Sequence, residues 1–285
     1  MNTFPDIKLN VGDYVEAFVK YLVDNFSVVF DAIRDFFSMI LINMQDFLIW
    51  FPWWAFIIVI FLLGWRFKSL PAGILFAALM FLVGTFGMWE EMMITIAIVL
   101  TAVIISLIIG IPLGVLMAFS KWFSAMTRPV LDAMQTMPSF VYLIPAIFFF
   151  GLGNVPGIFA TLIYALPPVI RLTELALRNV DSEVIESAES FGSSRWQMLT
   201  KVQLPQALPT IMAGVNQTTM MALAMVVIAS MVGAQGLGEQ VLIAINRIDI
   251  SLGFEAGISI VFLAIIIDRV SGGVAERFQK HRGTE

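Results

Sequence analysis

The chain has 285 residues, of which 59% are hydrophobic and 13% charged, and its mean hydropathy is +0.91. A water-soluble domain of this composition could not cover its surface with polar groups, so we expect an all-α polytopic membrane protein. The net charge of −5 provides no basic surface for nucleic acid. Cysteine is absent, which excludes thiolate chemistry, and the single histidine is His281. We therefore expect little catalytic apparatus in the chain itself.

Residues 1–46 are predicted to form an extracytoplasmic amphipathic helix. Apolar residues recur there at steps of three and four, at Val11, Val15, Phe18, Leu22, Phe26, Val29, Ile33, Phe36, Ile40 and Met44. Charged residues occupy the opposite side, so the helix is too polar to span and is expected to lie along the outer membrane surface. A helix that packs on the spanning bundle for stability alone is the alternative.

About seven membrane spans are expected, because a crossing needs ~20 mostly apolar residues. The segments with few or no charges are 47–63, 70–88, 92–120, two spans between 132 and 171, 204–232 and 255–270. The turn Gly151-Leu-Gly-Asn154 separates the two middle spans, and Gly233, Gly236 and Gly238 mark a re-entry after the sixth. The first two spans, in residues 47–90, are assigned as peripheral, residues 91–275 as the core and residues 276–285 as a cytoplasmic tail.

The distribution of Lys and Arg predicts the orientation. Twelve of the 16 basic residues fall in segments that share one side if the C-terminus is cytoplasmic, namely 64–71, 120–129, 171–201 and 268–285. The outer turn at Glu90 and Glu91 is acidic. Seven spans then place the N-terminus outside a cell membrane. Asp132 is expected at the cytoplasmic rim, where Arg128 lies one helical turn away.

Residues 171–201 form the one long cytoplasmic loop, and the pattern within it predicts a short amphipathic helix. Asp181, Ser182 and Glu183 suit a helix N-terminus, and Gly192 suits a C-terminal cap. A helix presented in this way could dock in a groove of a soluble partner. A solvated connecting hairpin is the alternative.

The same loop resembles the EAA signature of ABC importer permeases. Glu186-Ser187-Ala188, three residues, Gly192, nine residues and Val202-Gln-Leu204-Pro205 keep the spacing of that motif, with Ser187 and Val202 as departures. The likeness widens to the osmoprotectant type, for glycine betaine and proline, through the stretches 134–145 and 223–229.

The resemblance implies a type I ABC importer transmembrane fold whose five core helices are the last five spans. It implies ATPase coupling through Glu186, Ser187, Ala188, Gly192, Leu204 and Pro205, and import of glycine betaine or a related compatible solute in osmoprotection. ATP and Mg would be bound by a partner ATPase, since the chain lacks a phosphate-binding loop and is no enzyme itself. A separate extracytoplasmic substrate-binding protein, a second permease copy and membrane lipid are the other expected partners.

A translocation path needs kinked helices and inward polar groups. Pro138 and Pro145 are expected to lie on one side of a kinked helix, and Pro167-Pro168 to interrupt the next span. The candidate path residues are Met137, Pro138, Phe140, Tyr142 and Asn216. Alternatively, such residues only shape the bundle and bond to neighbouring helices.

Two other classes of function fit the sequence less well. A secondary carrier or osmotically gated channel that acts alone would need a charged residue near the bilayer centre or an internal repeat, and the sequence shows neither. A membrane-embedded enzyme is disfavoured by the absence of cysteine and of paired buried carboxylates.

Overall fold

The computed structural model describes residues 10–280, and this part of the chain is almost entirely helical, without a β-strand. Residues 1–9 and 281–285, which include His281, lie outside the described part. The longer helices are α1 (Val11–Trp50), α2 (Trp53–Phe67), α3 (Leu70–Thr85), α4 (Trp89–Phe119), α5 (Lys121–Thr136), α6 (Leu143–Phe150), α7 (Asn154–Arg178), α8 (Ser182–Ser190), α10 (Leu204–Ala229), α11 (Leu237–Arg247) and α12 (Ile250–Lys280). The short turns are η1 (Ser139–Tyr142), α9 (Arg195–Gln197), η2 (Met198–Gln203) and η3 (Ser230–Val232). The all-α class is confirmed.

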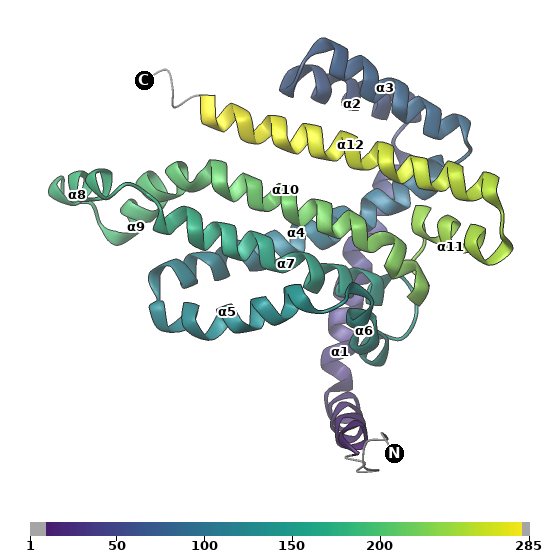
Figure 1. Cartoon of the computed structure of the whole chain (residues 1–285), viewed down its shortest axis with the longest axis horizontal. Helices are drawn as coiled ribbons and strands as arrows, with labels where there is room; N and C mark the ends of the chain where they lie inside the picture. The colour runs from purple at the N-terminus through teal and green to yellow at the C-terminus, as the bar shows by residue number, and fades with distance from the viewer. Residues whose placement is uncertain (1–9, 281–285) are drawn as a thin grey trace, which may run out of the picture.

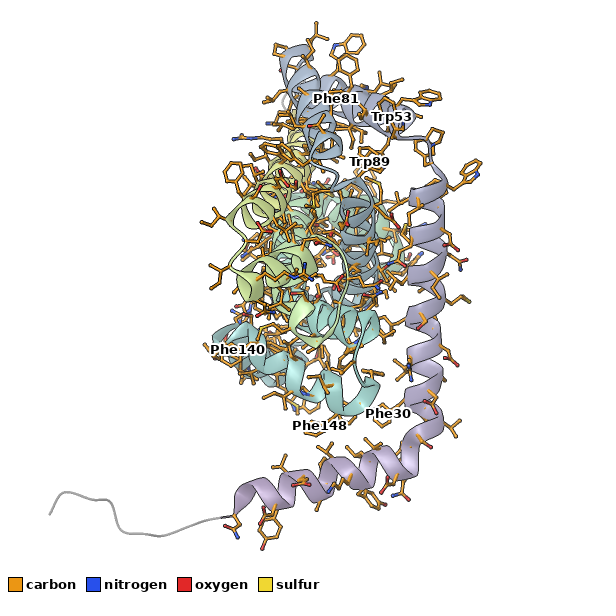
Figure 2. The ribbon with its side chains drawn as sticks, turned by 90° about the vertical axis from the view of Figure 1, so that its right-hand side faces the viewer. Phe30, Trp53, Phe81, Trp89, Phe140 and Phe148 are labelled. Atoms are coloured by element: carbon orange, nitrogen blue, oxygen red, sulfur yellow. The ribbon has the colours of Figure 1, made fainter. Side chains whose placement is uncertain are left out.

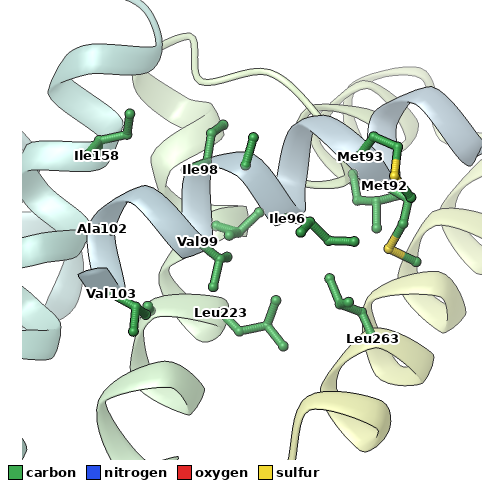
Figure 3. Close-up of a cluster of buried hydrophobic side chains, with 14 of the residues drawn as sticks. Met92, Met93, Ile96, Ile98, Val99, Ala102, Val103, Ile158, Leu223 and Leu263 are labelled. Atoms are coloured by element: carbon green, nitrogen blue, oxygen red, sulfur yellow. The ribbon is translucent and has the colours of Figure 1, made fainter. Parts of the chain in front are cut away.

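The centre of the molecule is a bundle in which α7 packs between α4 and α10, and α12 packs on α10 (Figure 1). The main core forms along α4. Figure 3 shows Met92, Ile96 and Val99 of α4 directed toward Leu223 of α10 and Leu263 of α12. A helix that is apolar all round, as α4 is, can bury residues on several faces at once, which explains its central position.

Two glycines bring α4 and α7 into direct contact. A Cβ at Gly110 would lie 2.5 Å from Cγ1 of Val169, and one at Gly114 would lie 2.6 Å from Cβ of Thr173. Small residues four apart allow two membrane helices to approach until their backbones nearly touch. The contact between α4 and α7 therefore depends on the absence of side chains at these two positions.

The helices α2 and α3 form an antiparallel hairpin that lies beside α12 (Figure 1). Gly64 and Gly73 face each other at its crossing, where a Cβ on Gly64 would lie 2.7 Å from Cα of Gly73. Met80 and Val83 of α3 are buried against the rest of the core. The hairpin is thus packed on the bundle along one face.

Helix α1 bends at Phe26, where the backbone leaves helical geometry with φ −119° and ψ 21°. The part after the bend runs across the bundle, whereas the part before it leaves the bundle (Figure 2). Phe37, Leu41 and Leu48 are buried, and Phe30 stacks on Phe149 at 4.7 Å. Residues 27–50 therefore pack on the bundle.

The buried face of α1 differs from the predicted one by about one residue. Phe36, which belongs to the predicted apolar face, is 52% exposed, whereas its neighbour Phe37 is 6% exposed. Residues 36–44 are apolar on most sides of the helix, so the spacing alone did not determine which side is buried.

The number of helices that could cross a membrane is lower than the expected seven. Among the described residues four helices are long and apolar enough, α4, α7, the continuous α9–η3 segment and α12, or up to six if each of two bent pairs is one span. One bent pair is α1 with α2, at 99°, and the other is α5 with η1 and α6, at 112°. The expected span 47–63 is divided at Phe51-Pro52, and the span expected after Asp132 is divided at Met137-Pro138.

Candidate functional site: the exposed helix α8 and the helices that hold it

Helix α8 projects from one end of the bundle, at the opposite end from α11 (Figure 1). The carboxylate of Asp181 caps it by accepting a hydrogen bond from the backbone N–H of Glu183 at 2.9 Å. At the other end Gly192 has φ +79°, and its N–H donates to the carbonyl of Glu189 at 2.8 Å. Both predicted helix ends are confirmed, because each depends on residues close in sequence.

Glu186 and Ser187 of α8 are exposed, and Ala188 is half-buried. Ala188 and Phe191 border a hollow of about 440 Å³, and Trp196 borders a second hollow of about 720 Å³ beside the same helix. The ring of Phe191 is 89% exposed and that of Trp196 is 71% exposed. Exposed aromatic side chains beside apolar hollows are typical of protein–protein interfaces, where side chains of one partner fill pockets of the other.

The chain returns from α8 to the bundle through a well-defined sequence of turns. Ser194 and Gln197 form a reciprocal capping box at the start of α9. The π-helical turn η2 follows and leads directly into α10, where Leu204 and Pro205 occupy the first positions. Leu204 packs against the buried cluster that contains Leu177 of α7 and Ile211 of α10. Helix α8 is therefore joined to the bundle at both ends, to α7 through residues 179–181 and to α10 through α9 and η2.

The bend between α5 and α6 contains four of the five candidate path residues. Helix α5 ends at Thr136, so Pro138 and Pro145 do not lie on one continuous helix, contrary to the prediction. Phe140 is 57% exposed (Figure 2), whereas Tyr142 is buried and donates its hydroxyl to the carbonyl of Met134. The ring of Tyr142 also meets that of Tyr164 on α7, at 5.9 Å. Tyr142 thus fixes the bend, while Met137 and Phe140 are exposed on it.

Asn216, the fifth candidate, contacts a different helix. Its amide donates to the carboxylate of Asp268 on α12 at 3.2 Å and accepts from the hydroxyl of Ser271. This set of hydrogen bonds fastens α10 to α12. The candidate path residues are therefore divided between the α5–α6 bend and the α10–α12 contact.

The adjacent prolines Pro167 and Pro168 were expected to interrupt this span, but α7 continues through them. Both are buried inside a helix that continues from Asn154 to Arg178. Because α7 packs against both α4 and α10, tertiary contacts hold the helix through the two positions where a backbone donor is missing.

A charged cluster around the buried carboxylate of Glu174, near α8, was not predicted. Glu174 on α7 is 4% exposed and accepts hydrogen bonds at one carboxylate oxygen from Ser124 (2.7 Å) and Arg128 (2.9 Å) of α5. Arg178, one turn further along α7, pairs with the same oxygen at 3.0 Å and donates to the carbonyl of Met117 on α4 at 2.8 Å. We call these four side chains, Ser124, Arg128, Glu174 and Arg178, the Glu174 cluster.

Glu174 falls within the predicted loop 171–201, but α7 remains helical through Arg178. Asp132, predicted to lie one turn from Arg128, pairs with Arg171, whereas Arg128 pairs with Glu174. The spacing of Glu174 and Arg178, four residues apart, is the local signal for an ion pair on one helix face. The partner on α5 has no comparable signal, because it is 46 residues distant in the chain.

At the opposite end of the bundle the glycine-rich turns meet. The N–H of Gly153 donates to the carbonyl of Val232 at 2.8 Å, and the side chain of Asn154 accepts from the N–H of Gln235 at 2.8 Å. The hydroxyl of Thr95 on α4 accepts from the N–H of Leu237 at 2.8 Å. We call this set of neutral contacts the glycine clasp. The predicted turns at 151–154 and 233–238 are confirmed, with left-handed φ values at Gly151, Gly153, Gly233 and Gly236.

Comparison with known proteins assigns this architecture to a family. Residues 110–281 match the model of the binding-protein-dependent transport system inner membrane component. The chain belongs to this family. The matched region contains α8, both helices that hold it and the Glu174 cluster.

Full-length relatives extend the similarity to the N-terminal helices. The chain is 44% identical over 283 residues to the glycine betaine/proline betaine transport system permease protein ProW of Escherichia coli (strain K12), covering 99% of this chain and 80% of the relative. It is 41% identical to the glycine betaine transport system permease protein OpuAB of Bacillus subtilis (strain 168), with 99% of both chains covered. Both relatives are permease proteins of transport systems.

A solved structure of the MetNI methionine ABC transporter, in an inward-facing conformation, shares the fold. The TM-score is 0.60 at 22% identity, over 70% of this chain and 97% of the other. The expected importer fold is thereby confirmed, and the comparisons favour an importer permease of the inner membrane over a carrier or channel that acts alone. In this family the permease works with an ATPase and a substrate-binding protein.

Proposed function

We propose that this chain forms the translocation path of an ATP-driven importer of glycine betaine or a related compatible solute, acting in osmoprotection. The substrate class is supported by the names of the relatives, which match the chain over nearly its whole length. The observation that carries the mechanism is the exposed α8 helix, which is held at both ends by long helices of the bundle. A displacement applied to α8 must pass into α7 and α10.

Helix α8 is the docking element for the ATPase. Glu186 and Ser187 face outward, Ala188 borders an apolar hollow, and Gly192 closes the helix in a conformation that favours glycine. Leu204 and Pro205 join the docking element to α10. ATP and Mg are bound by the ATPase, so this chain needs no cofactor of its own.

The end that carries α8 faces the cytoplasm. The α4–α5 turn and the C-terminal end of α12 lie at this same end (Figure 1), in segments that contain much of the Lys and Arg. The N-terminus then lies outside. The many exposed apolar side chains of the spanning helices contact membrane lipid and a second copy of the chain.

The path runs past the bend at Met137, Pro138, Phe140 and Tyr142. The aromatic rings there could face a quaternary ammonium, which is attracted by ring faces and offers no hydrogen-bond donor. Asn216 influences the path from the α10–α12 contact. The substrate is delivered by the extracytoplasmic binding protein.

The test is uptake of labelled glycine betaine into vesicles that contain the chain, its ATPase and its binding protein. Uptake should require ATP and should be lost in Gly192→Trp, because a bulky residue with strained backbone replaces the turn beside the docked ATPase. Gly87→Trp is the matched control: Gly87 has φ +74° and open space around it, as Gly192 does, but lies at the outer α3–α4 turn. Normal uptake by Gly192→Trp, or uptake without the ATPase, would contradict the proposal.

A further inference from the structure

The Glu174 cluster is placed where a movement of α8 would enter the bundle. Glu174 lies about one helical turn before α7 ends at Arg178, and α8 begins at Ser182 after a short break. The last turn of α7, from Glu174 to Arg178, moves as a rigid unit. Glu174 must therefore follow any displacement that α8 transmits to the end of α7.

On the other side, the cluster holds α5. Ser124 and Arg128 both donate from α5 to the carboxylate of Glu174, and Ser124 is 3% exposed. Helix α5 then leads directly into the bend at Met137–Tyr142, with the change of direction of 112°. A shift of α5 along or about its axis would consequently move Met137 and Phe140.

Among the polar contacts between α5 and α7, those of the cluster are the strongest. The cross-helix hydrogen bonds to Glu174 are charge-assisted, and Glu174 itself is buried although the side chain of Arg128 is 57% exposed, so solvent and salt screen them less than a pair with an exposed carboxylate. The Asp132–Arg171 pair, which joins the same two helices, has exposed fractions of 63% and 36%. Glu174 is thus the main polar contact between α5 and α7, beside the apolar cluster of Leu131 of α5 with Val169 and Ile170 of α7.

We propose that Arg128 and Glu174 are positioning residues that transmit the displacement of α8 to α5, and hence to the path at the α5–α6 bend. This inference rests on the proposed function, since it assigns a role within the ATP-driven cycle. Arg178 has a different role. It holds the carboxylate in place, ties α7 to the carbonyl of Met117 on α4 and keeps Glu174 neutralised when Arg128 is removed.

Arg128→Gln is the variant of choice because it removes the charged contact between α5 and Glu174 and leaves only the hydrogen bond from the neutral hydroxyl of Ser124, while Arg178 still neutralises the carboxylate. We expect ATP hydrolysis to persist and the ratio of betaine uptake to ATP hydrolysed to fall by about fivefold or more, the usual scale of coupling between two sites. Arg128→Lys, which keeps the charge, should recover part of the ratio. The matched control is Asp132→Asn, which breaks the exposed pair between the same helices and should change the ratio by less than about twofold.

A distance measurement separates transmission from simple loss of structure. The chain has no cysteine, so spin labels can be placed at Gln135→Cys on α5, Leu175→Cys on α7 and Val261→Cys on α12, all at exposed positions. In the assembled complex, adding ATP should change both the 135–261 and the 175–261 distances. In Arg128→Gln only the 175–261 distance should still change.

The two proposals fail in different ways. If the complex without the Arg128 substitution neither hydrolyses ATP nor changes either distance, the proposed function is wrong. Suppose instead that this complex hydrolyses ATP and changes both distances. If Arg128→Gln then shows the same two distance changes and the same uptake ratio, only the role of the Glu174 cluster is wrong. An equal loss of coupling in Asp132→Asn would also overturn that role, because any contact between α5 and α7 would then serve.

Discussion

The two ends of the bundle are fastened by different chemistry. At the end opposite α8, the glycine clasp consists of neutral hydrogen bonds from backbone N–H groups in turns shaped by glycine. At the end that carries α8, Glu174 and two arginines form a charged cluster across α5 and α7. The first depends on backbone shape and close approach, whereas the second depends on charge. Substitutions at the two ends should therefore destabilise the protein for different physical reasons.

The largest effect is expected at the glycine clasp, from Gly236→Leu. Gly236 has φ +101°, and a Cβ there would lie 2.6 Å from Oγ1 of Thr95. Backbone strain and overpacking together should destabilise the protein by about 4 kcal/mol. Thermal unfolding of the purified chain in detergent measures this. Gly257→Leu on α12, where nothing lies within 4 Å of the added Cβ, is the control and should unfold near the original temperature.

A smaller loss of stability is expected at the other end, from Glu174→Ala. The substitution removes the three charge-assisted contacts of Glu174, while Arg128 (57% exposed) and Arg178 (32% exposed) keep part of their solvation, so it should cost about 2 kcal/mol. The same unfolding measurement applies, with Glu189→Ala on the exposed α8 helix as the control. An unchanged unfolding temperature for Glu174→Ala would show that the cluster contributes no stability.

The smallest effect is expected for Arg171→Gln, which removes the half-buried partner of the exposed Asp132. An exposed ion pair should contribute less than about 1 kcal/mol, and its contribution should decrease further as salt is raised. Thermal unfolding at low and at high salt measures this contribution and its decrease with salt. If Arg171→Gln lowered the stability as much as Glu174→Ala does, the buried carboxylate of Glu174 would be no more important for stability than the exposed one of Asp132.

Features that depend on neighbouring residues could be predicted from the sequence, and those that depend on distant partners could not. The Asp181 cap and the glycine at 192 were predicted correctly, since each acts within a few residues of itself. The pairing of Arg128 with Glu174 was missed because it joins residues on two helices. Tertiary packing also decided which face of α1 is buried and kept α7 helical through Pro167 and Pro168.

The glycine contact between α4 and α7 has a mechanical consequence. At Gly114 the two helices meet with no side chain on α4, and the carbonyl of Ile170 would lie 2.7 Å from an added Cβ. Side chains accommodate sliding by changing rotamers, but a contact made by backbone has no such freedom. Helices α4 and α7 should consequently move as one rigid unit. A change between inward and outward states would then be made by the helices that surround this pair.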